Sequence, residues 1–477
     1  MDLVVVGGGI LGLAAARCWL LRTPGGKLLL LEKEARVAAH QTGHNSGVLH
    51  SGLYYTPGTQ KARNCRRGKA LMEAFCEARG VPFRRVGKLV VATSAGQQEA
   101  LGELEARGRE HGVALSRVDA AGIRAIEPAA GGIAGLHLPE TAIVDYVAVA
   151  EALADEVREL GGELRFGVRV TSMRSVDVAG ALGVRLELEG GESLHAKAAL
   201  VCCGLQADRV ARAAGLEPGR AEGSRPALRI VPFLGSYFDL KPEYAARVRG
   251  LIYPVPDARF PFLGVHLTRR MPARSGSRER LEAGREGGGR GPQHEGGSSD
   301  DGADFDPTAG RVDAGPNAAL AFAREGYGRR AGGRFRLRDA ASALSWPGTW
   351  KLVGRQASQA AAELWRSLSR EAFAREAARL VPELTTDWLV PARPGVRAQA
   401  LGRDGRLVDD YVFAREGAML HVLNAPSPAA TASLAIAEEL IDALGWTYGV
   451  ALRSAGVEAL GSGAGCLQEL EPRSSGT

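Results

Sequence analysis

The first 32 residues restrict the fold more than any other part of the chain. In "DLVVVGGGILGLAAARCWLL" an apolar run is followed by a glycine-rich turn and then by a helical pattern. Gly7, Gly9 and Gly12 have the G-x-G-x-x-G spacing of a strand–turn–helix unit whose helix begins at a bound pyrophosphate. The first glycine permits the tight turn, the second lets the backbone approach the phosphates, and the third lets the helix pack closely on the strand. The pattern therefore predicts a dinucleotide-binding domain.

The residues after this unit indicate which dinucleotide is bound. Glu32, twenty residues beyond Gly12, ends the strand pattern "KLLLLEKE". An acidic side chain there accepts hydrogen bonds from the 2′-OH of an unphosphorylated ribose, as in FAD or NAD. An NAD domain would usually continue through regular βαβ units, whereas this chain runs into "TGHNSGVLHSGLYY", a loop of small and polar residues at 42–55. Such a loop suits a flavin laid against it, so FAD is favoured over NAD. Two residues of the first helix and the neighbour of Glu32 are expected beside the same cofactor: Ile10, Leu11 and Lys33.

Composition limits the other functions that the chain can have. Its 477 residues, 45% hydrophobic and 24% charged, suit two or three globular units. No run approaches the about eighteen apolar residues of a membrane span. The net charge of +6 comes mostly from scattered arginines, so no nucleic-acid partner is predicted. The six cysteines have neither metal nor disulfide spacing, and we expect them to be free in a reducing compartment, with no metal site. A strand pattern begins at residue 3, so we expect no targeting leader in this chain.

The hydrophobic pattern predicts an α/β fold of two domains that are each discontinuous in sequence. The first is a Rossmann-like FAD-binding domain. The second is an α+β substrate domain built on a mostly antiparallel β-sheet, with aromatic-rich strands such as "RIVPFLGSYFDL". Amphipathic helices are expected at 63–79 and 97–111. The FAD-binding domain is assigned residues 1–80, 140–225 and 385–446, and the substrate domain residues 81–139 and 226–384.

Two further segments are expected to lie outside both domains. Residues 272–310 are rich in Gly, Ser and charge, so they cannot bury enough surface to offset the entropy cost of ordering. They are interpreted as a disordered insertion in a hairpin of the substrate domain. Residues 447–477 are interpreted as a loose C-terminal tail.

Several segments together carry a resemblance to a known family. They are "VVVGGGILGLAAAR", "TGHNSGVLHSGLYYTPGTQKARNCRRG", "FPFLGVHLTRRM", "GVRAQAL" and "NAPSPAATASLAIA". They resemble the L-2-hydroxyglutarate dehydrogenases, which belong to the FAD-dependent oxidoreductases related to D-amino-acid oxidase and glycerol-3-phosphate dehydrogenase. The resemblance implies FAD-dependent oxidation of (S)-2-hydroxyglutarate, a small dicarboxylate, to 2-oxoglutarate by hydride transfer from C2 to flavin N5. It also implies a quinone-type electron acceptor and a mitochondrial location with peripheral inner-membrane association.

This chemistry needs a base for the hydroxyl proton and cations for the carboxylates. Neutral imidazole suits the first role, and the candidates are His50, from the loop beside the flavin, and His266, from a strand of the substrate domain. The resemblance implies that Arg397 in "PGVRAQA" binds the C1 carboxylate, for which a bidentate guanidinium is preferred. Tyr55 and Tyr237 could donate phenolic hydrogen bonds to the substrate, although packing is the commoner use of a strand tyrosine.

The remaining candidate residues are predicted to contact the flavin. The polar loop would approach the flavin through its glycines and hydrogen-bond it through its polar side chains, which assigns it Gly43, His44, Asn45, Ser46 and Gly47. Later strand ends are expected to pass close to the cofactor at Val170, Cys203 and Gly204. The segment "NAPSPAATASLAIA" predicts a helix start whose N–H groups face the flavin pyrimidine, contributing Asn424, Ser427, Pro428 and Ala429.

Other functions are compatible with the same sequence. The chain could be a related FAD oxidoreductase that acts on another 2-hydroxy acid, on glycerol 3-phosphate or on an amino acid. Its basic composition allows a flavoprotein that acts on tRNA, but no Lys/Arg stripe or aromatic platform supports this function. A third alternative is a flavin-binding protein inactivated by the insertion. His44, His50 and His266 could each instead be a structural histidine hydrogen-bonded in a packed turn, and His421 in "AMLHVLN" is predicted to be a core residue of the last strand.

Overall fold

The fold is described from a computed structural model, which covers residues 1–178, 180–216, 227–256, 264–272, 310–327, 335–355, 369–392 and 394–448. Of the expected insertion at 272–310, residues 273–309 lie outside the described residues, as do residues 449–477 of the expected tail at 447–477. None of the helices in the described ranges has both the length and the hydropathy needed to cross a membrane.

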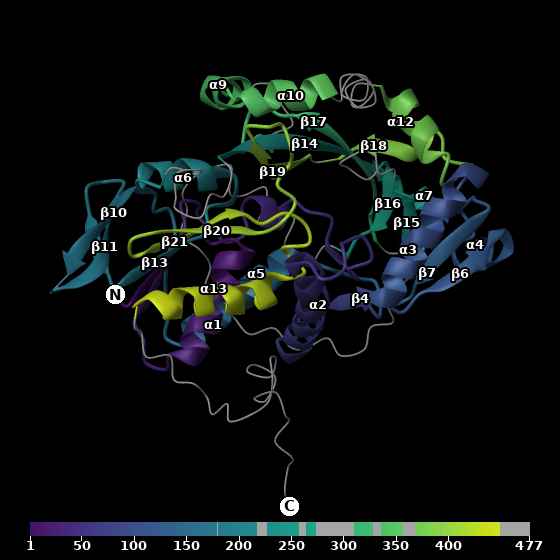
Figure 1. The fold of residues 1–477 in the computed structure, drawn as a ribbon. Coiled ribbons are helices and arrows are strands. Elements are labelled where there is room, and N and C mark those ends of the chain that lie inside the picture. The colour runs from purple at the N-terminus through teal and green to yellow at the C-terminus, as the bar shows by residue number, and fades with distance from the viewer. Residues whose placement is uncertain are drawn as a thin grey trace, which may run out of the picture.

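The N-terminal unit lies at the centre of a six-stranded sheet (Figure 1). β1 (Leu3–Val6) pairs in parallel with β2 (Leu28–Leu31) on one side and with β13 (Ala198–Val201) on the other. The strand order is β20 (Val412–Glu416), β21 (Met419–Asn424), β13, β1, β2 and β9 (Glu163–Arg165), and β20 runs antiparallel to β21. Because β1 and β2 are buried on both faces, they are continuous apolar runs in the sequence.

Alternate residues of β1 meet different partners on the two faces of this sheet. Leu3 and Val5 pack in the cluster that contains the buried residues of three helices, which are α1 (Ile10–Arg22), α5 (Tyr146–Glu159) and α13 (Ser433–Tyr448). Val4 and Val6 pack on the other face against a three-stranded antiparallel sheet of β10 (Val170–Val178), β11 (Ala181–Leu188) and β12 (Ser193–Ala196). This period-two alternation buries β1 between a helical layer and a second sheet.

A nine-stranded sheet forms the other half of the described structure. Its order is β18 (Leu389–Pro391), β14 (Leu228–Leu240), β17 (Val312–Leu320), β16 (His266–Arg269), β15 (Leu251–Pro254), β5 (Lys88–Ala92), β7 (Ala134–Leu138) and β6 (Ser116–Asp119), and β19 (Gly395–Gly402) pairs with β14. The pair β15–β5 is parallel, whereas the other pairs are antiparallel. β16 and β17 form the hairpin that flanks the expected insertion. The predicted α/β fold with a second, mostly antiparallel sheet is confirmed.

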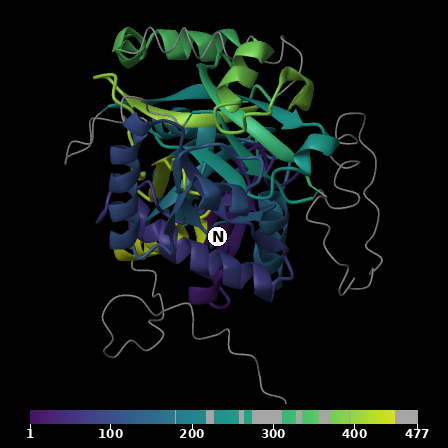
Figure 2. The ribbon, with the colours of Figure 1, turned by 90° about the vertical axis from the view of Figure 1, so that its right-hand side faces the viewer.

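Helices cover the outer face of the nine-stranded sheet. Leu89 and Val91 of β5 pack outward in a cluster with α4 (Ala120–Ile126), α7 (Pro242–Ala245) and α12 (Arg370–Ala377). Val90 packs on the inner face with α3 (Gln98–Glu110) and with Val48 and Leu53 of the polar loop. α9 (Leu337–Leu344) and α10 (Pro347–Arg355) lie over β14 and β19, and in both views they are at the opposite end of the molecule from α1 and α13 (Figure 2).

Strand pairing corrects one of the domain boundaries drawn from the sequence. The sequence assigns 385–446 as a whole to the FAD-binding domain, but β18 and β19 pair with β14 and so belong to the nine-stranded sheet. The strand–loop–helix pattern of this segment is a local property, whereas sheet membership depends on a partner strand far away in the sequence. In contrast, the two helices expected at 63–79 and 97–111 are confirmed as α2 (Gln60–Ala78) and α3. A small sheet of β3 (Val48–Leu49), β8 (Ala142–Val144) and β4 (Phe83–Arg85) follows the polar loop.

Candidate active site

A cavity of about 1200 Å³ is lined by residues of both large sheets. Ordinary ligand pockets measure about 300–1,000 Å³, so this one has room for a dinucleotide together with a small substrate. We call the part formed by Gly7–Gly12 and Glu32 the cofactor end, and the part formed by His50, Tyr237, Tyr253, His266 and Arg397 the substrate end. Most of the residues predicted from the sequence line the cavity: Gly7, Gly9, Ile10, Leu11, Glu32, Lys33, His44, Asn45, Ser46, His50, Tyr55, Val170, Cys203, Gly204, Tyr237, His266, Arg397, Asn424, Ser427, Pro428 and Ala429. Three of the predicted residues do not line it: Gly12, Gly43 and Gly47.

Two glycines of the first turn are required by the packing of the protein itself. Gly7 has a φ of +113°, and a Cβ there would lie 2.4 Å from the carbonyl oxygen of Cys202. A Cβ on Gly12 would lie 2.0 Å from the carbonyl oxygen of Gly7, so α1 packs directly on the turn. Side chains at either position would prevent the turn from closing.

Gly9 meets a different requirement, because the space beside it is open to the cavity. The nearest atom to a Cβ on Gly9 would be Thr42 Oγ1, at 3.5 Å. Gly9 is the N-cap of α1 and has no side chain to cap the helix, while Ile10 N donates a hydrogen bond to Thr42 Oγ1 at 3.1 Å. The start of α1 therefore presents backbone N–H groups and the positive end of the helix dipole to the cavity, which is what a pyrophosphate requires. The residues present fit the phosphates of FAD.

Glu32 and Lys33 continue the cofactor end where β2 finishes. The Glu32 carboxylate is 8% exposed and accepts hydrogen bonds from Gly8 N at 2.6 Å and from Glu34 N at 2.9 Å. These bonds hold the carboxylate beside the glycine turn, where it can accept a hydrogen bond from a ribose hydroxyl. Lys33 Nζ contacts Glu34 and lies 3.2 Å from the carboxylate of Glu325, so its positive charge compensates theirs.

The glycines of the polar loop pack against the protein itself. They were expected to let the flavin approach closely, but neither residue lines the cavity. A Cβ on Gly43 would lie 2.4 Å from the carbonyl oxygen of Ala38. Gly47 has a φ of +68°, and a Cβ there would lie 2.9 Å from the carbonyl oxygen of Val144. These glycines let the loop pack against the protein, which is a tertiary contact that the sequence does not reveal.

The polar side chains of the same loop are partly used by the loop itself. Asn45 Nδ2 donates to the carbonyl oxygen of Thr42 at 2.7 Å, and Asn45 Oδ1 accepts from Gly47 N at 2.8 Å. The ring of His44 stacks on Tyr327 with centroids 4.0 Å apart. That the loop also hydrogen-bonds the flavin stays a prediction.

The segment from Asn424 to Ala429 is tied to its surroundings by hydrogen bonds at both ends. Asn424 Nδ2 donates to the carbonyl oxygens of Val408 at 2.9 Å and Asp410 at 2.8 Å. The hydroxyl of Tyr55 hydrogen-bonds Ser427, which joins this segment to the end of the polar loop. Tyr55 is therefore held as part of the cavity wall.

His50 lies at the substrate end, directly after β3. Its backbone N–H donates to Oγ1 of Thr431 at 3.2 Å, and Thr431 is fully buried. Burial, followed by the nearby charges of Lys88, His266 and Arg397, lowers the pKa of His50 to about 3. The imidazole is therefore neutral at physiological pH, which is the form that can accept a proton.

His266, in β16, has the second imidazole of the substrate end. The side chain is 6% exposed, and its ring packs on Tyr253 with centroids 4.0 Å apart. Burial is the largest cause that lowers the pKa of His266 to about 3, opposed by the hydrogen bond to Gly264 and aided by the charges of Arg397 and Lys88. Because Nδ1 donates to the carbonyl oxygen of Gly264 at 2.9 Å, the proton of the neutral ring is on Nδ1. Nε2 then keeps the lone pair that a general base needs.

Arg397, in β19, brings a cation to the same end. Its guanidinium reaches the hydroxyl of Tyr237 with Nη2 at 3.5 Å, so the predicted anchor and the predicted phenol lie together. Within the described residues no carboxylate forms an ion pair with Arg397. Its charge is therefore available to an anionic ligand.

Two predictions about residues outside the site are confirmed. His421, in β21, is 1% exposed, and burial lowers its pKa to about 4, so it is a neutral core residue as expected. No disulfide joins the cysteines of the described ranges to one another, and Cys466 lies outside those ranges. Neither finding adds chemistry to the cavity.

Sequence reasoning missed several residues that support the site, namely Thr42, Lys88, Tyr253 and Thr431. Lys88 did carry a usable signal, because a charged residue that begins an otherwise apolar, buried strand is uncommon. The two threonines carried none, since small hydroxyl residues are ordinary in loops and near helix starts. Their roles depend on contacts made only in the folded chain.

Comparison with known proteins defines the class to which this fold and cavity belong. Residues 2–443 match the family described as FAD dependent oxidoreductase. The chain belongs to this family, and its cofactor is FAD.

Within that class the chain is similar to proteins named L-2-hydroxyglutarate dehydrogenase. It is 40% identical to the mitochondrial protein of that name from Nematostella vectensis, covering 92% of this chain and 90% of the relative. It is 38% identical to the Indibacter alkaliphilus protein, covering 91% and 96%, and 37% identical to the mitochondrial protein from Homo sapiens, covering 92% and 88%. The resemblance inferred from the sequence motifs is confirmed.

Solved structures of lower identity share the fold. An L-alpha-glycerophosphate oxidase from Mycoplasma pneumoniae has a TM-score of 0.65 at 19% identity, covering 93% of this chain and 94% of the other. A glycine oxidase from Geobacillus kaustophilus has a TM-score of 0.61 at 15% identity, with coverage of 93% and 94%. At these identities the likeness establishes the architecture and not the substrate.

Proposed function

We propose that this protein catalyses the FAD-dependent oxidation of (S)-2-hydroxyglutarate to 2-oxoglutarate. The observation that carries the proposal is the pairing of a neutral, tautomer-fixed His266 with the unpaired cation of Arg397 at the substrate end. A base and a carboxylate anchor are the two groups that oxidation of a 2-hydroxy acid needs. The similarity to L-2-hydroxyglutarate dehydrogenases supports the choice of this 2-hydroxy acid over others.

In this mechanism each residue of the substrate end has one task. Arg397 binds the C1 carboxylate together with the hydroxyl of Tyr237, which orients C2. His266 accepts the hydroxyl proton at Nε2, because its Nδ1 proton is committed to Gly264. His50, neutral as well, orients the same hydroxyl from the loop side. FAD, bound at the cofactor end, supplies the two-electron acceptor.

We also infer a quinone-type electron acceptor and a mitochondrial, inner-membrane-associated location. The support is the resemblance to relatives from Nematostella vectensis and Homo sapiens that are named mitochondrial; relatives from Indibacter alkaliphilus and Escherichia coli are bacterial. Reoxidation of the reduced protein by a soluble quinone should be much faster than by oxygen. Equal rates with both acceptors would contradict this inference.

The test of the main proposal is an anaerobic spectrum of the purified flavoprotein. Adding (S)-2-hydroxyglutarate should bleach the flavin absorbance, whereas the (R) enantiomer, glycerol 3-phosphate and amino acids should not. Bleaching by glycerol 3-phosphate or an amino acid, with none by (S)-2-hydroxyglutarate, would replace the proposed substrate by the one that reacts.

A further inference from the structure

Lys88 is a buried cation that the proposed mechanism does not use. Its side chain is 2% exposed, and its Nζ lies 4.2 Å from the ring centroid of Tyr253 and 4.8 Å from that of Tyr54. Within the described residues no carboxylate pairs with Lys88, and no group accepts a hydrogen bond from it. Contacts with aromatic faces offset only part of the cost of removing an ammonium group from water. An ammonium in this position is expected to find its counter-charge in a ligand.

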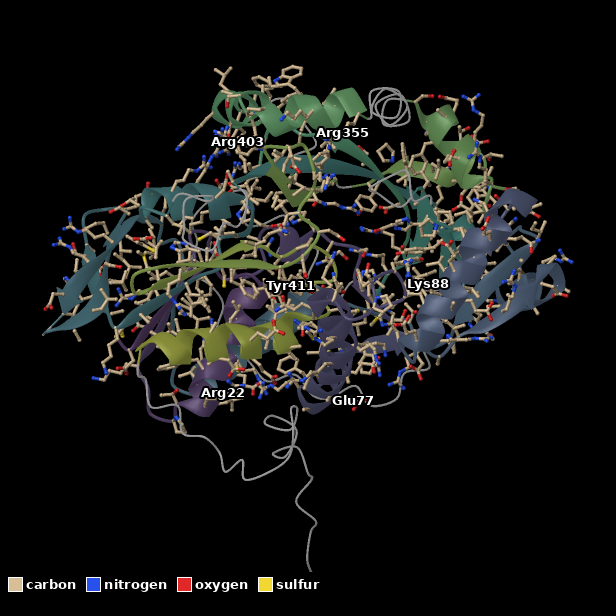
Figure 3. All side chains as sticks on the ribbon, viewed as in Figure 1. Arg22, Glu77, Lys88, Arg355, Arg403 and Tyr411 are labelled. Carbon is tan, nitrogen blue, oxygen red and sulfur yellow. The ribbon has the colours of Figure 1, made fainter. Side chains whose placement is uncertain are left out.

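The strand register places Lys88 on the inner face of the nine-stranded sheet. Lys88 of β5 is opposite Leu251 of β15, so Tyr253, two residues further along β15, is on the same face. Tyr253 packs in turn on His266 of the next strand. Both rings beside the ammonium, those of Tyr54 and Tyr253, line the cavity, whereas Lys88 itself is not among the lining residues, so a ligand would reach the ammonium between the two rings. In Figure 3 Lys88 lies at mid-height to the right of the centre, whereas the labelled Arg355 and Arg403 lie in the upper part of the molecule.

The two unpaired cations both act electrostatically on the two histidines. Lys88 and Arg397 each appear among the charges that lower the pKa of His50 and of His266, after burial, which is the largest cause. Both cations are therefore within electrostatic reach of the same imidazoles, and they reach them from different strands, β5 and β19. A ligand held beside the histidines would meet positive charge on two sides.

We propose that Lys88, between Tyr54 and Tyr253, forms a second anion-binding subsite that binds the distal carboxylate of a dicarboxylate substrate. The inference rests on the proposed function, in which Arg397 binds the C1 carboxylate. A 2-hydroxy acid without a second carboxylate leaves the Lys88 ammonium buried and unpaired, so the site selects against it. Lys88 is in this way the residue that distinguishes the five-carbon dicarboxylate from shorter or monobasic 2-hydroxy acids.

The test is a binding titration that does not depend on turnover. Perturbation of the flavin spectrum of the FAD-bound protein is followed with 2-oxoglutarate and, as a matched ligand, with 2-oxopentanoate, which has the same carbon chain without the distal carboxylate. Lys88→Met should raise the dissociation constant of 2-oxoglutarate by about 30- to 1,000-fold, the loss of affinity expected when one partner of a buried charge pair is removed. It should leave the dissociation constant of 2-oxopentanoate within about threefold of the wild-type value.

Lys69→Met is the matched control, because Lys69 carries the same charge but its ammonium pairs with Glu73 at 2.7 Å. It should change neither dissociation constant. Lys88→Gln is the second variant, should Lys88→Met not fold. The proposed subsite would be wrong if the Lys88 variants weakened the binding of both ligands equally. It would also be wrong if the wild-type protein bound 2-oxoglutarate no more tightly than 2-oxopentanoate.

The wild-type protein offers a second readout through pH. Burial lowers the pKa of Lys88 to about 7, while burial raises the pKa of its neighbours Cys65 and Tyr253 to about 12 and that of Tyr54 well above its usual value. His50 and His266 are already neutral above about pH 4. Above pH 7 the free site loses its proton, so the dissociation constant of 2-oxoglutarate should rise by up to tenfold per pH unit. That of 2-oxopentanoate should not, and parallel pH profiles for the two ligands would contradict the proposal.

Failure of the subsite and failure of the proposed function give different results. If the flavin is not reduced by (S)-2-hydroxyglutarate but 2-oxoglutarate binds with the Lys88-dependent preference, the function is wrong and the subsite stands. If (S)-2-hydroxyglutarate reduces the flavin but Lys88→Met affects both ligands alike, the function stands and the subsite is wrong.

Discussion

The cofactor end and the substrate end of the cavity are built in opposite ways. The cofactor end comes from one continuous stretch, Gly7–Gly12, joined by Glu32, and most of its contacts use backbone groups. The substrate end gathers side chains from β14, β15, β16 and β19 of the nine-stranded sheet, which lie far apart in the sequence, together with His50 from the polar loop. One end binds a dinucleotide that many enzymes share, and in our proposal the other selects the substrate through its cations and neutral imidazoles. Cofactor binding is therefore a local property of the chain, whereas substrate choice is a property of the folded sheet.

The comparison predicts that the largest single effect comes from the cofactor end. Gly9→Val should give a folded but colourless protein, because a Cβ there would have only Thr42 Oγ1 of the protein within 4 Å but would enter the space required by the pyrophosphate. Gly12→Val, in contrast, should fail to fold, since its Cβ would lie 2.0 Å from the carbonyl oxygen of Gly7. Flavin content and circular dichroism of the purified variants distinguish the two results.

Gly96→Val is the matched control for Gly9→Val. A Cβ on Gly96 would meet no atom within 4 Å, and this glycine is not among the residues that line the cavity. The control should keep its full flavin content. A Gly9→Val protein that is as yellow as this control would show that the pyrophosphate does not bind at the start of α1.

Effects at the substrate end should leave FAD bound and act on the reaction. His266→Ala should slow flavin reduction by (S)-2-hydroxyglutarate by about two to four orders of magnitude, the usual contribution of a general base. His50→Ala should cost less, because it orients the hydroxyl in our proposal. Stopped-flow reduction of the flavin measures both variants.

The pH dependence of flavin reduction can be measured in the same experiment. Burial is the main cause that lowers the pKa of His50 and His266 to about 3, so neither group gains a proton between pH 8 and pH 5. The rate constant for reduction at saturating substrate should then show no acidic limb in this range. If the flavin of the His266→Ala variant is reduced at the wild-type rate, the base is another group and the role assigned to His266 is wrong.

Arg397→Lys should have a smaller effect, on affinity more than on rate. An ammonium group cannot replace the two parallel hydrogen bonds of a guanidinium, and the loss of one charged hydrogen bond weakens binding by about 10- to 100-fold. The dissociation constant of 2-oxoglutarate measures this loss, with 2-oxopentanoate as the comparison. Both ligands should be weakened alike, because both carry the C1 carboxylate; an effect on 2-oxoglutarate alone would mean that Arg397 binds the distal carboxylate instead.

The contrast between the two ends also explains which parts of the fold could be predicted. The turn at Gly7–Gly12 and the apolar strands beside it follow from neighbours in the sequence, so the parallel sheet and its cofactor were predictable. β18 and β19 were assigned to the wrong sheet, because nothing in a strand's own sequence identifies its pairing partner. β14, which pairs with both of them, is far away in the chain.

For the site, the same limit applies to individual residues. Thr42 and Thr431 act through single hydrogen bonds to Ile10 and His50 that exist only in the folded chain. Gly43 and Gly47 were correctly seen as positions of close approach, but the atoms that they approach belong to Ala38 and Val144 and not to a ligand. A glycine indicates that other atoms approach the backbone closely, but only the tertiary structure shows to which residues those atoms belong.

The smallest effect is expected from the segment that belongs to neither end. Replacing residues 272–310 by a two-residue turn should leave flavin content and turnover nearly unchanged and shift the melting temperature by no more than about 4 °C, equivalent to about 1 kcal/mol. The strands on either side are already paired up to that point, with Arg269 opposite Val312 and Arg270 N donating to the carbonyl oxygen of Arg311 at 2.8 Å. A short turn can close such an antiparallel pair. His266 lies at the other end of β16, opposite Gly315, so the catalytic end of the strand is not altered. A flavin-free product would mean that this end of the hairpin takes part in the cofactor end of the cavity. A large loss of turnover with FAD still bound would mean that it takes part in the substrate end.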